Sequence, residues 1–188
     1  MKLLIITLTV LQSLFTTLEK HTLQSDFNIN ITAEDAQPMT YTGSLSMRGK
    51  QFELQMFSMD AAYDGHTLYI YSEDTDELSL SIPTEEELLT TNPFLYAQAL
   101  FPACDYAECV MGDKTQITLT PKANATNLPT PIVKFVLRVN TATLLPISVE
   151  IQEQNGTITT LRLINAHFTA TTPSFVLTRE GAFINDLR

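Results

Sequence analysis

The sequence contains no tryptophan, two cysteines and three histidines, and its six glycines are scattered singly. The histidines, His21, His66 and His167, form no pair at the spacing of metal ligands. A glycine-rich phosphate loop and a nucleophile turn of the G-x-S-x-G type are also missing from the sequence. We therefore expect no metal, no other cofactor and no catalytic residue.

Basic residues are also scarce, with 11 Lys and Arg against 21 Asp and Glu, which gives a formal net charge of −10. Binding to nucleic acid depends on clustered cations, so we expect no nucleic-acid partner. The same charge disfavours adhesion to an anionic bilayer. At 44% hydrophobic and 17% charged residues, the 188-residue chain can bury a substantial core, and we expect residues 1–188 to form a single domain.

The two cysteines, Cys104 and Cys109, lie close together in the sequence. A local disulfide between them is possible if the segment turns back on itself, and it would imply an oxidising compartment. Two reduced, partly buried thiols are the alternative. The sequence leaves both open.

Most of the chain alternates between apolar and polar residues, the pattern of strands with one apolar and one solvated face. The turn dipeptides Asp64-Gly65 and Asn155-Gly156 indicate hairpins between successive strands. The pattern predicts an α+β fold with one strongly curved antiparallel sheet of roughly ten or eleven strands, and about three helices against its concave side. The expected strands cover residues 27–32, 39–47, 52–56, 66–71, 77–82, 116–119, 132–139, 147–152 and 157–164, with short last strands at Phe168 and at 175–177.

The first 21 residues permit two interpretations. Lys2 followed by an apolar run is typical of a secretion signal, although no small-x-small cleavage site follows. Leu4, Leu8, Leu11, Phe15 and Leu18 recur at intervals of three and four, which instead predicts an amphipathic helix over residues 3–21. We favour the helix over a residual signal segment.

A second helical region is predicted at residues 84–101, inside the run of strands. Thr84 followed by Glu87 has the spacing of a capping box. Asn92-Pro93 then predicts a new helix that runs to about Leu100, with proline at its first position. Such an insertion must lie over an end or a face of the sheet.

Several segments resemble the LolA family of periplasmic lipoprotein carriers. Residues 64–71, DGHTLYIY, are similar to the family segment DGKTLWFY. The turn Arg48-Gly49-Lys50 precedes it, LTPKA follows at 119–123, and FVLT at 175–178 resembles the closing segment of the family. The likeness runs in the same order from about Phe27 to the C-terminus. Tyr69 replaces the family's tryptophan and Thr178-Arg179 replaces its Pro-Pro pair, as expected of a divergent member.

The resemblance implies an incomplete β-barrel with a helical lid, here residues 1–21 and 84–101, over an apolar cavity. It also implies that Arg48 latches the lid, although the lysine and proline that flank this arginine in the family are Met47 and Gly49 here. Leu11, Phe15, Leu18, Phe94 and Leu95 are the expected lid residues. The expected cavity residues are Leu45, Met47, Phe52, Leu54, Met56, Leu78, Leu80, Ile82, Phe135, Leu137 and Val149.

By the resemblance, the protein is expected to be a periplasmic, monomeric carrier without enzymatic activity. It would bind the acyl chains of lipoproteins or a related amphiphile and transfer them to the outer membrane. An inner-membrane lipoprotein-releasing transporter and an outer-membrane acceptor are then the implied partners. The residues by themselves instead favour a secreted structural or protein-interaction domain whose interior is filled by its own side chains, and the resemblance reverses that preference.

Overall fold

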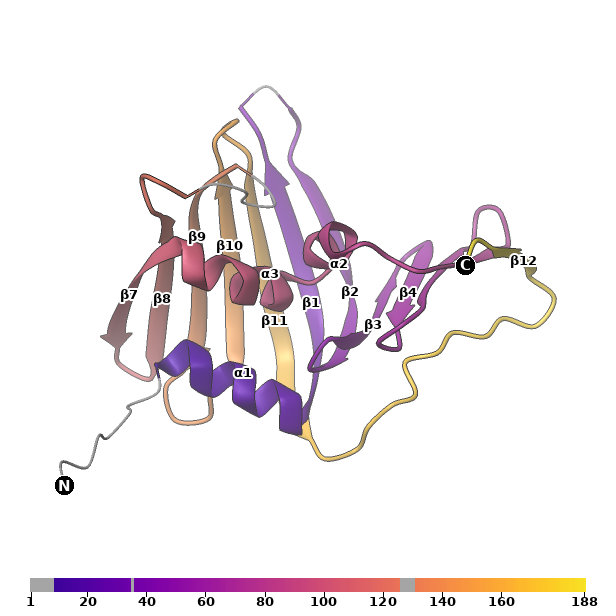
Figure 1. Ribbon diagram of the computed structural model, residues 1–188, viewed down its shortest axis with the longest axis horizontal. Coiled ribbons are helices and arrows are strands. Elements are labelled where there is room, and N and C mark those ends of the chain that lie inside the picture. Colours follow the sequence, from indigo (N-terminus) through magenta and orange to yellow (C-terminus); the bar gives the residue numbers. More distant parts are fainter. Residues whose placement is uncertain (1–8, 35, 126–130) are drawn as a thin grey trace.

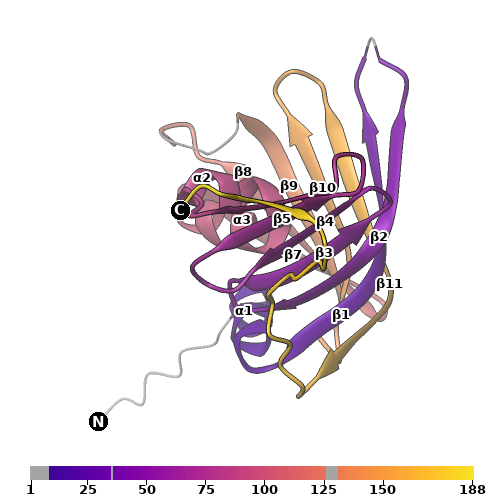
Figure 2. The ribbon, with the colours of Figure 1, turned by 90° about the vertical axis from the view of Figure 1, so that its right-hand side faces the viewer.

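The fold is a curved twelve-stranded sheet with three α-helices on its concave side (Figures 1 and 2). The computed structural model describes residues 9–34, 36–125 and 131–188. The helices are α1 (Val10–Lys20), α2 (Glu85–Thr91) and α3 (Pro93–Leu100), and the 3-10 turn η1 (Phe101–Ala103) follows α3. The strands are β1 (Thr22–Thr32), β2 (Met39–Arg48), β3 (Gln51–Met56), β4 (Met59–Tyr63), β5 (Leu68–Ser72), β6 (Glu77–Ser81), β7 (Cys104–Met111), β8 (Lys114–Pro121), β9 (Ile132–Asn140), β10 (Pro146–Glu153), β11 (Ile158–Thr169) and β12 (Phe183–Asp186).

The sheet has the strand order β12-β6-β5-β4-β3-β2-β1-β11-β10-β9-β8-β7. Its neighbours pair antiparallel, except that β12 pairs parallel with β6. In the described residues no pairing joins β12 to β7, so the sheet curls without closing. The α+β class and the curved, incomplete barrel predicted from the sequence are confirmed.

Three strands were not predicted as such, and one predicted strand is absent. Strands β4, β7 and β12 lie in segments for which the sequence predicted no strand. Phe168 is part of β11, and residues 175–177 are irregular because they leave the sheet and cross its convex side. There Phe175 adopts a left-handed backbone conformation, with φ of 53°, and buries its ring.

The helix α1 begins at a capping box. The Thr9 side chain accepts a hydrogen bond from the backbone N–H of Gln12, whose side chain accepts one from the Thr9 backbone. The described helix is shorter than the predicted one, and Leu4 and Leu8 lie outside the described residues. Leu11, Leu14 and Leu18 are buried along one side of it.

The two short helices begin where the sequence predicts. Thr84 caps α2 in a capping box with Glu87, and Asn92 caps α3, in which Pro93 is the first residue. The chain then passes through η1 into β7. All three α-helices lie within the curl of the sheet (Figure 2).

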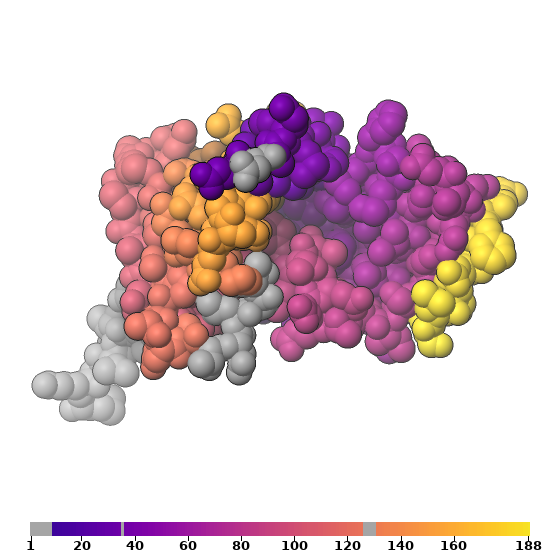
Figure 3. All heavy atoms as spheres, turned by 90° about the horizontal axis from the view of Figure 1, so that it is seen from above, coloured from indigo at the N-terminus to yellow at the C-terminus, as the bar shows by residue number. Residues whose placement is uncertain are grey.

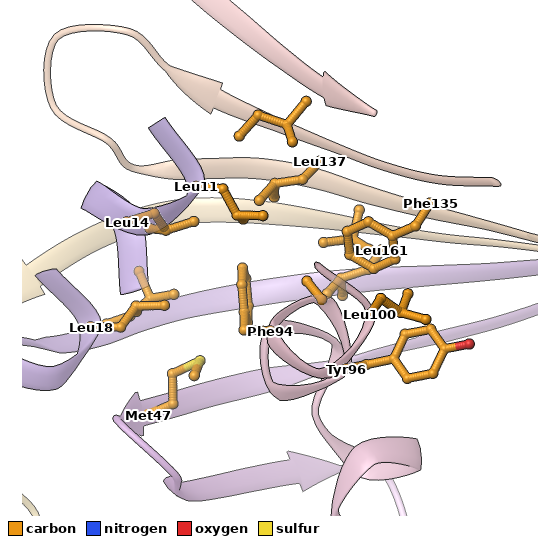
Figure 4. Packing of buried hydrophobic residues seen from close by; sticks show 14 of the residues in the cluster. Leu11, Leu14, Leu18, Met47, Phe94, Tyr96, Leu100, Phe135, Leu137 and Leu161 are labelled. Atoms are coloured by element: carbon orange, nitrogen blue, oxygen red, sulfur yellow. The ribbon is translucent and has the colours of Figure 1, made fainter. Parts of the chain in front are cut away.

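The main core lies between the concave face and the helices. Leu11, Leu14 and Leu18 of α1 point toward Phe94 of α3 and Leu137 of β9, and Tyr96 lies beside Phe135 (Figure 4). The rings of Tyr96 and Phe135 are 6.2 Å apart between centroids. Over β8 and β9 the interior is thus filled by side chains of the helices.

A second, smaller core lies on the opposite face of the sheet. It contains Ala62, Tyr69, Leu78 and Leu177, so the segment after β11 covers this end of the convex side. Arg179 of this segment pairs with Asp60, and its guanidinium lies 5.0 Å from the centre of the Tyr71 ring. This segment then leads into β12.

Candidate functional site

An apolar groove of about 390 Å³ lies between the middle of the concave face and the pair α2–α3. Seen from above, the molecule is hollowed between the strand ends and the magenta helices (Figure 3). Ligand sites of proteins typically measure about 300–1,000 Å³. The groove is lined by Phe27, Ile29, Ile31, Leu45, Phe52, Leu54, Leu89, Thr90, Thr91, Asn92, Pro93, Tyr96, Val149, Ile151, Glu153, Thr159 and Leu161.

Strand β1 forms the centre of the groove floor. Ile29 is paired with Leu161 of β11, and Phe27 with Gly43 of β2. Paired residues of neighbouring strands share a face, so the apolar residues of β1, β10 and β11 meet here. A Cβ atom at Gly43 would lie 2.6 Å from the Phe27 ring and 2.0 Å from the backbone oxygen of Gln55. Because Gly43 has no side chain, the Phe27 ring has room to pack over it.

The helices α2 and α3 form one wall of the groove, and α2 is loosely attached. None of the seven residues of α2 is buried, although Leu88 and Leu89 pack against the main core. In α3, by contrast, Phe94, Leu95, Tyr96, Ala97 and Leu100 are buried. Displacement of α2 would therefore cost far less apolar burial than displacement of α3.

Polar groups of three kinds interrupt the lining: the hydroxyls of Thr90, Thr91 and Thr159, one amide and one carboxylate. Asn92, at the junction of α2 and α3, is 3% exposed. Glu153, the last residue of β10, is the single charged residue among the described residues that line the groove.

Of the predicted cavity residues, Leu45, Phe52, Leu54 and Val149 line this groove. Met47, Phe135 and Leu137 also lie on the concave side, but they are fully buried beneath the helices. Met56 is half-buried beside the main core. The structure therefore brings eight of the eleven predicted residues to one face, and four of them to the groove.

Leu78, Leu80 and Ile82 require a correction. They share a face, as the alternation predicts, but it is the convex one, because Leu78 pairs with Tyr71 and Leu80 with Tyr69. Leu78 lies in the second core, with Leu80 packed against it, and Ile82 is exposed. The concave face of β6 carries Glu77, Ser79 and Ser81, whose register follows that of Met56, Leu54 and Phe52.

The predicted lid residues all lie on helices over the concave side. Leu11, Leu18, Phe94 and Leu95 are buried, and Phe15 is half-buried. Phe15, Leu18, Phe94 and Leu95, together with Met47, also line a smaller cavity of about 250 Å³ between α1 and α3.

Arg48, the predicted latch, contacts the end of α1. Its Nε donates a hydrogen bond of 3.3 Å to the backbone oxygen of Glu19, and its Nη1 donates to Thr172 Oγ1. Beside it, the Gly49 N–H donates to the backbone oxygen of Leu18 at 2.8 Å. The turn between β2 and β3 is thereby joined to α1 and to the segment that follows β11.

The sequence interpretation missed much of the groove. Phe27, Ile29 and Ile31 were recognised as one face of a strand, and their alternation was the available signal for a lining role. Asn92 was recognised as a helix start only. Ile151 shares a face with Val149 by the same alternation, although it was not predicted as a lining residue. Glu153, Thr159 and Leu161 gave no local signal, because their place depends on the pairing of β10 and β11 with β1.

The described residues contain no group of three or more His, Cys, Asp or Glu side chains placed to hold a metal ion.

Both thiols are free, Cys104 buried and Cys109 exposed. They lie on opposite faces of β7, so the local disulfide is not formed. Burial raises the pKa of the Cys104 thiol. Among the described residues no helix has the length and apolarity needed to span a membrane.

No family model and no curated protein matches the sequence. Among solved structures, an uncharacterized conserved protein from Thermus thermophilus aligns with 94% of this chain and 96% of its own, at a TM-score of 0.61 and 8% identity. The two proteins share a fold. A LolA superfamily protein from Nitrosomonas europaea aligns over 92% and 99% of the two chains, at a TM-score of 0.47 and 10% identity. A putative outer membrane lipoprotein-sorting protein domain from Vibrio parahaemolyticus aligns over 87% and 92%, at a TM-score of 0.42 and 8% identity.

Proposed function

We propose that this protein is a periplasmic, monomeric carrier that holds the acyl chains of a lipoprotein, or of a related amphiphile, in the groove beneath α2 and α3. The proposal rests on one observation, the open apolar groove of about 390 Å³ on the concave face. Transfer to the outer membrane then requires a releasing transporter in the inner membrane and an acceptor at the outer one. No step of this cycle is catalytic.

The energetics suit a carrier that must both take up and release its cargo. Burial of one methylene contributes roughly 0.8 kcal/mol, so a long acyl chain contributes on the order of ten kcal/mol. Release of the cargo requires that part of this binding free energy be offset. Closure of the loosely attached helix α2 over the empty groove, which buries Leu88 and Leu89 against the core, supplies such an offset.

Two leucines on opposite faces of the sheet allow a matched test. Leu54 lines the groove and Leu80 lies beside the second core, and both are partly buried. In Leu54→Gln we expect uptake of a fluorescent fatty-acyl probe to fall at least tenfold, whereas Leu80→Gln keeps the uptake of the natural sequence. Equal uptake by both folded variants would mean that the groove is not the binding site.

A second candidate is a structural or protein-interaction domain, which is favoured by the filled interior over β8 and β9. Gentle extraction followed by mass spectrometry distinguishes the two. A copurified amphiphile is expected of the carrier. The interaction domain would carry no amphiphile and would take up no acyl probe.

A further inference from the structure

Asn92 ends one helix and begins the next. Its backbone N–H donates to the Leu88 oxygen at 3.1 Å, which closes α2. Its side-chain Oδ1 accepts hydrogen bonds from the backbone N–H groups of Phe94 (3.0 Å) and Leu95 (3.2 Å), which begins α3. These two bonds fix the orientation of the amide, because only the oxygen can accept them.

The other half of the same amide has no partner. In the described part of the chain, no acceptor lies within hydrogen-bond reach of Asn92 Nδ2, which is buried in the wall of the groove. A buried donor without an acceptor costs free energy, so native proteins rarely keep one without a reason. Because Asn92 is the junction of α2 and α3, a ligand that displaces α2 uncovers this donor. An acceptor atom on the ligand would then remove the cost.

The charge that the described lining residues bring to the groove is negative. Glu153 is its single charged side chain among the described lining residues, which include no Lys, Arg or His. Glu153 is partly buried, and in a lining otherwise dominated by apolar residues its repulsion of a second anion is weakly screened. The groove can therefore accept an uncharged polar group more readily than a carboxylate.

We propose that Asn92 and Glu153 together select the polar end of the ligand. Asn92 Nδ2 donates to the carbonyl oxygen of an acyl ester or amide, and Glu153 disfavours an ionised fatty acid of the same chain length. This inference rests on the proposed function, since it concerns the ligand of the same groove.

Three probes with equal chains separate these effects: hexadecane, methyl hexadecanoate and hexadecanoate, each displacing an uncharged fluorescent acyl probe. Asn92→Asp keeps the oxygen that caps α3 but replaces the donor. We expect it to weaken binding of the ester roughly fivefold, the loss of one net hydrogen bond, and to leave binding of hexadecane within twofold. Asn92→Ser, which also caps helices, is the second variant, and unchanged hexadecane binding shows that its groove is intact.

Glu153→Gln keeps the shape of the side chain and removes its charge. We expect it to strengthen binding of hexadecanoate several-fold and to leave binding of the ester unchanged. If the ratio of ester to hexadecane affinity is the same in both Asn92 variants as in the natural sequence, the role of Asn92 is overturned while the carrier proposal stands. If none of the three probes binds to the natural protein, both fail.

Discussion

Asp64 closes the turn between β4 and β5 with three hydrogen bonds. Its Oδ1 accepts from the backbone N–H groups of His66 and Thr67, each at 2.8 Å, and its Oδ2 accepts from the Tyr69 hydroxyl at 3.1 Å. Burial by itself would raise the pKa of this carboxyl, but the donors at Thr67, His66 and Tyr69 outweigh it and lower the pKa. The turn at Asp64-Gly65 thus stabilises the ionised form of the Asp64 carboxyl group.

Because the folded pKa of Asp64 lies below the unfolded one, its contribution to stability is present at neutral pH and is lost as the pH falls through the folded pKa. Asp64→Asn keeps one acceptor but does not titrate. We expect this variant to be about 1 kcal/mol less stable than the natural protein at pH 7, from urea unfolding. The difference should begin to shrink as the pH falls below the unfolded pKa of about 3.9, and it should vanish below the lower folded pKa.

Asp74→Asn, in the exposed connector between β5 and β6, is the control for a general loss of negative charge. It should change the stability little at pH 7 or at pH 3. A stability deficit of Asp64→Asn that is the same at pH 7 and at pH 3 would contradict the role assigned to the carboxylate.

At the scale of elements, the glycine in β2 determines how closely β1, β2 and β3 approach. A Cβ atom at Gly43 would meet both the backbone oxygen of Gln55 and the ring of Phe27. A backbone atom cannot move aside as a flexible side chain can, so β2 and β3 would have to separate locally.

We expect Gly43→Ala to lower the free energy of unfolding by about 2 kcal/mol, within the range for overpacked positions. It should also weaken acyl-probe binding, because the displaced Phe27 ring is part of the groove floor. Chemical unfolding and probe titration measure the two effects. Thr42→Ala, at the exposed neighbouring position of the same strand, should affect neither. Full stability of Gly43→Ala would show that the strands can separate at no cost.

Elements with local signals were predictable from the sequence. The starts of α2 and α3 follow from Thr84, Glu87 and Asn92-Pro93, whose capping contacts involve residues at most three positions apart. The alternation of Leu78, Leu80 and Ile82 likewise predicted that they share a face.

Which face they occupy was not predictable from the alternation. Strands β5 and β6 have apolar residues on their convex side because the segment around Leu177, far away in the sequence, covers it. The groove likewise depends on residues that are far apart in the sequence, since its lining combines Asn92 with residues of β1 and β10. Its existence depends on how helices and sheet meet, and no local pattern encodes that.

At the scale of the whole molecule, Arg48 contacts two parts of the chain that are far from β2 in the sequence. It contacts Glu19 at the end of α1 and Thr172 in the segment after β11, and it stands at the end of β2. The helix α1 meets α3 around the small cavity lined by Leu18 and Phe94. We therefore expect that loosening α1 also loosens α3, which forms part of the wall of the groove.

We expect Arg48→Leu to favour the open, loaded form over the closed, empty one. Loss of about 1 kcal/mol of stabilisation from the empty form would raise the affinity for an acyl probe about fivefold and slow its release. The free energy of unfolding should change by less than about 1 kcal/mol, since the side chain is partly exposed. Probe titration, release kinetics and urea unfolding measure the three quantities.

Thr172→Val removes one of the two contacts and keeps the arginine, so its effect on affinity should lie between those of the natural protein and Arg48→Leu. Amide hydrogen exchange of α1 should increase in both variants while that of β8 and β9 stays the same, because the latch holds the helix and not the sheet. If Arg48→Leu exchanges faster in α1 but binds and releases the probe as the natural protein does, α1 is not coupled to the groove. The wall formed by α2 and α3 then opens by itself.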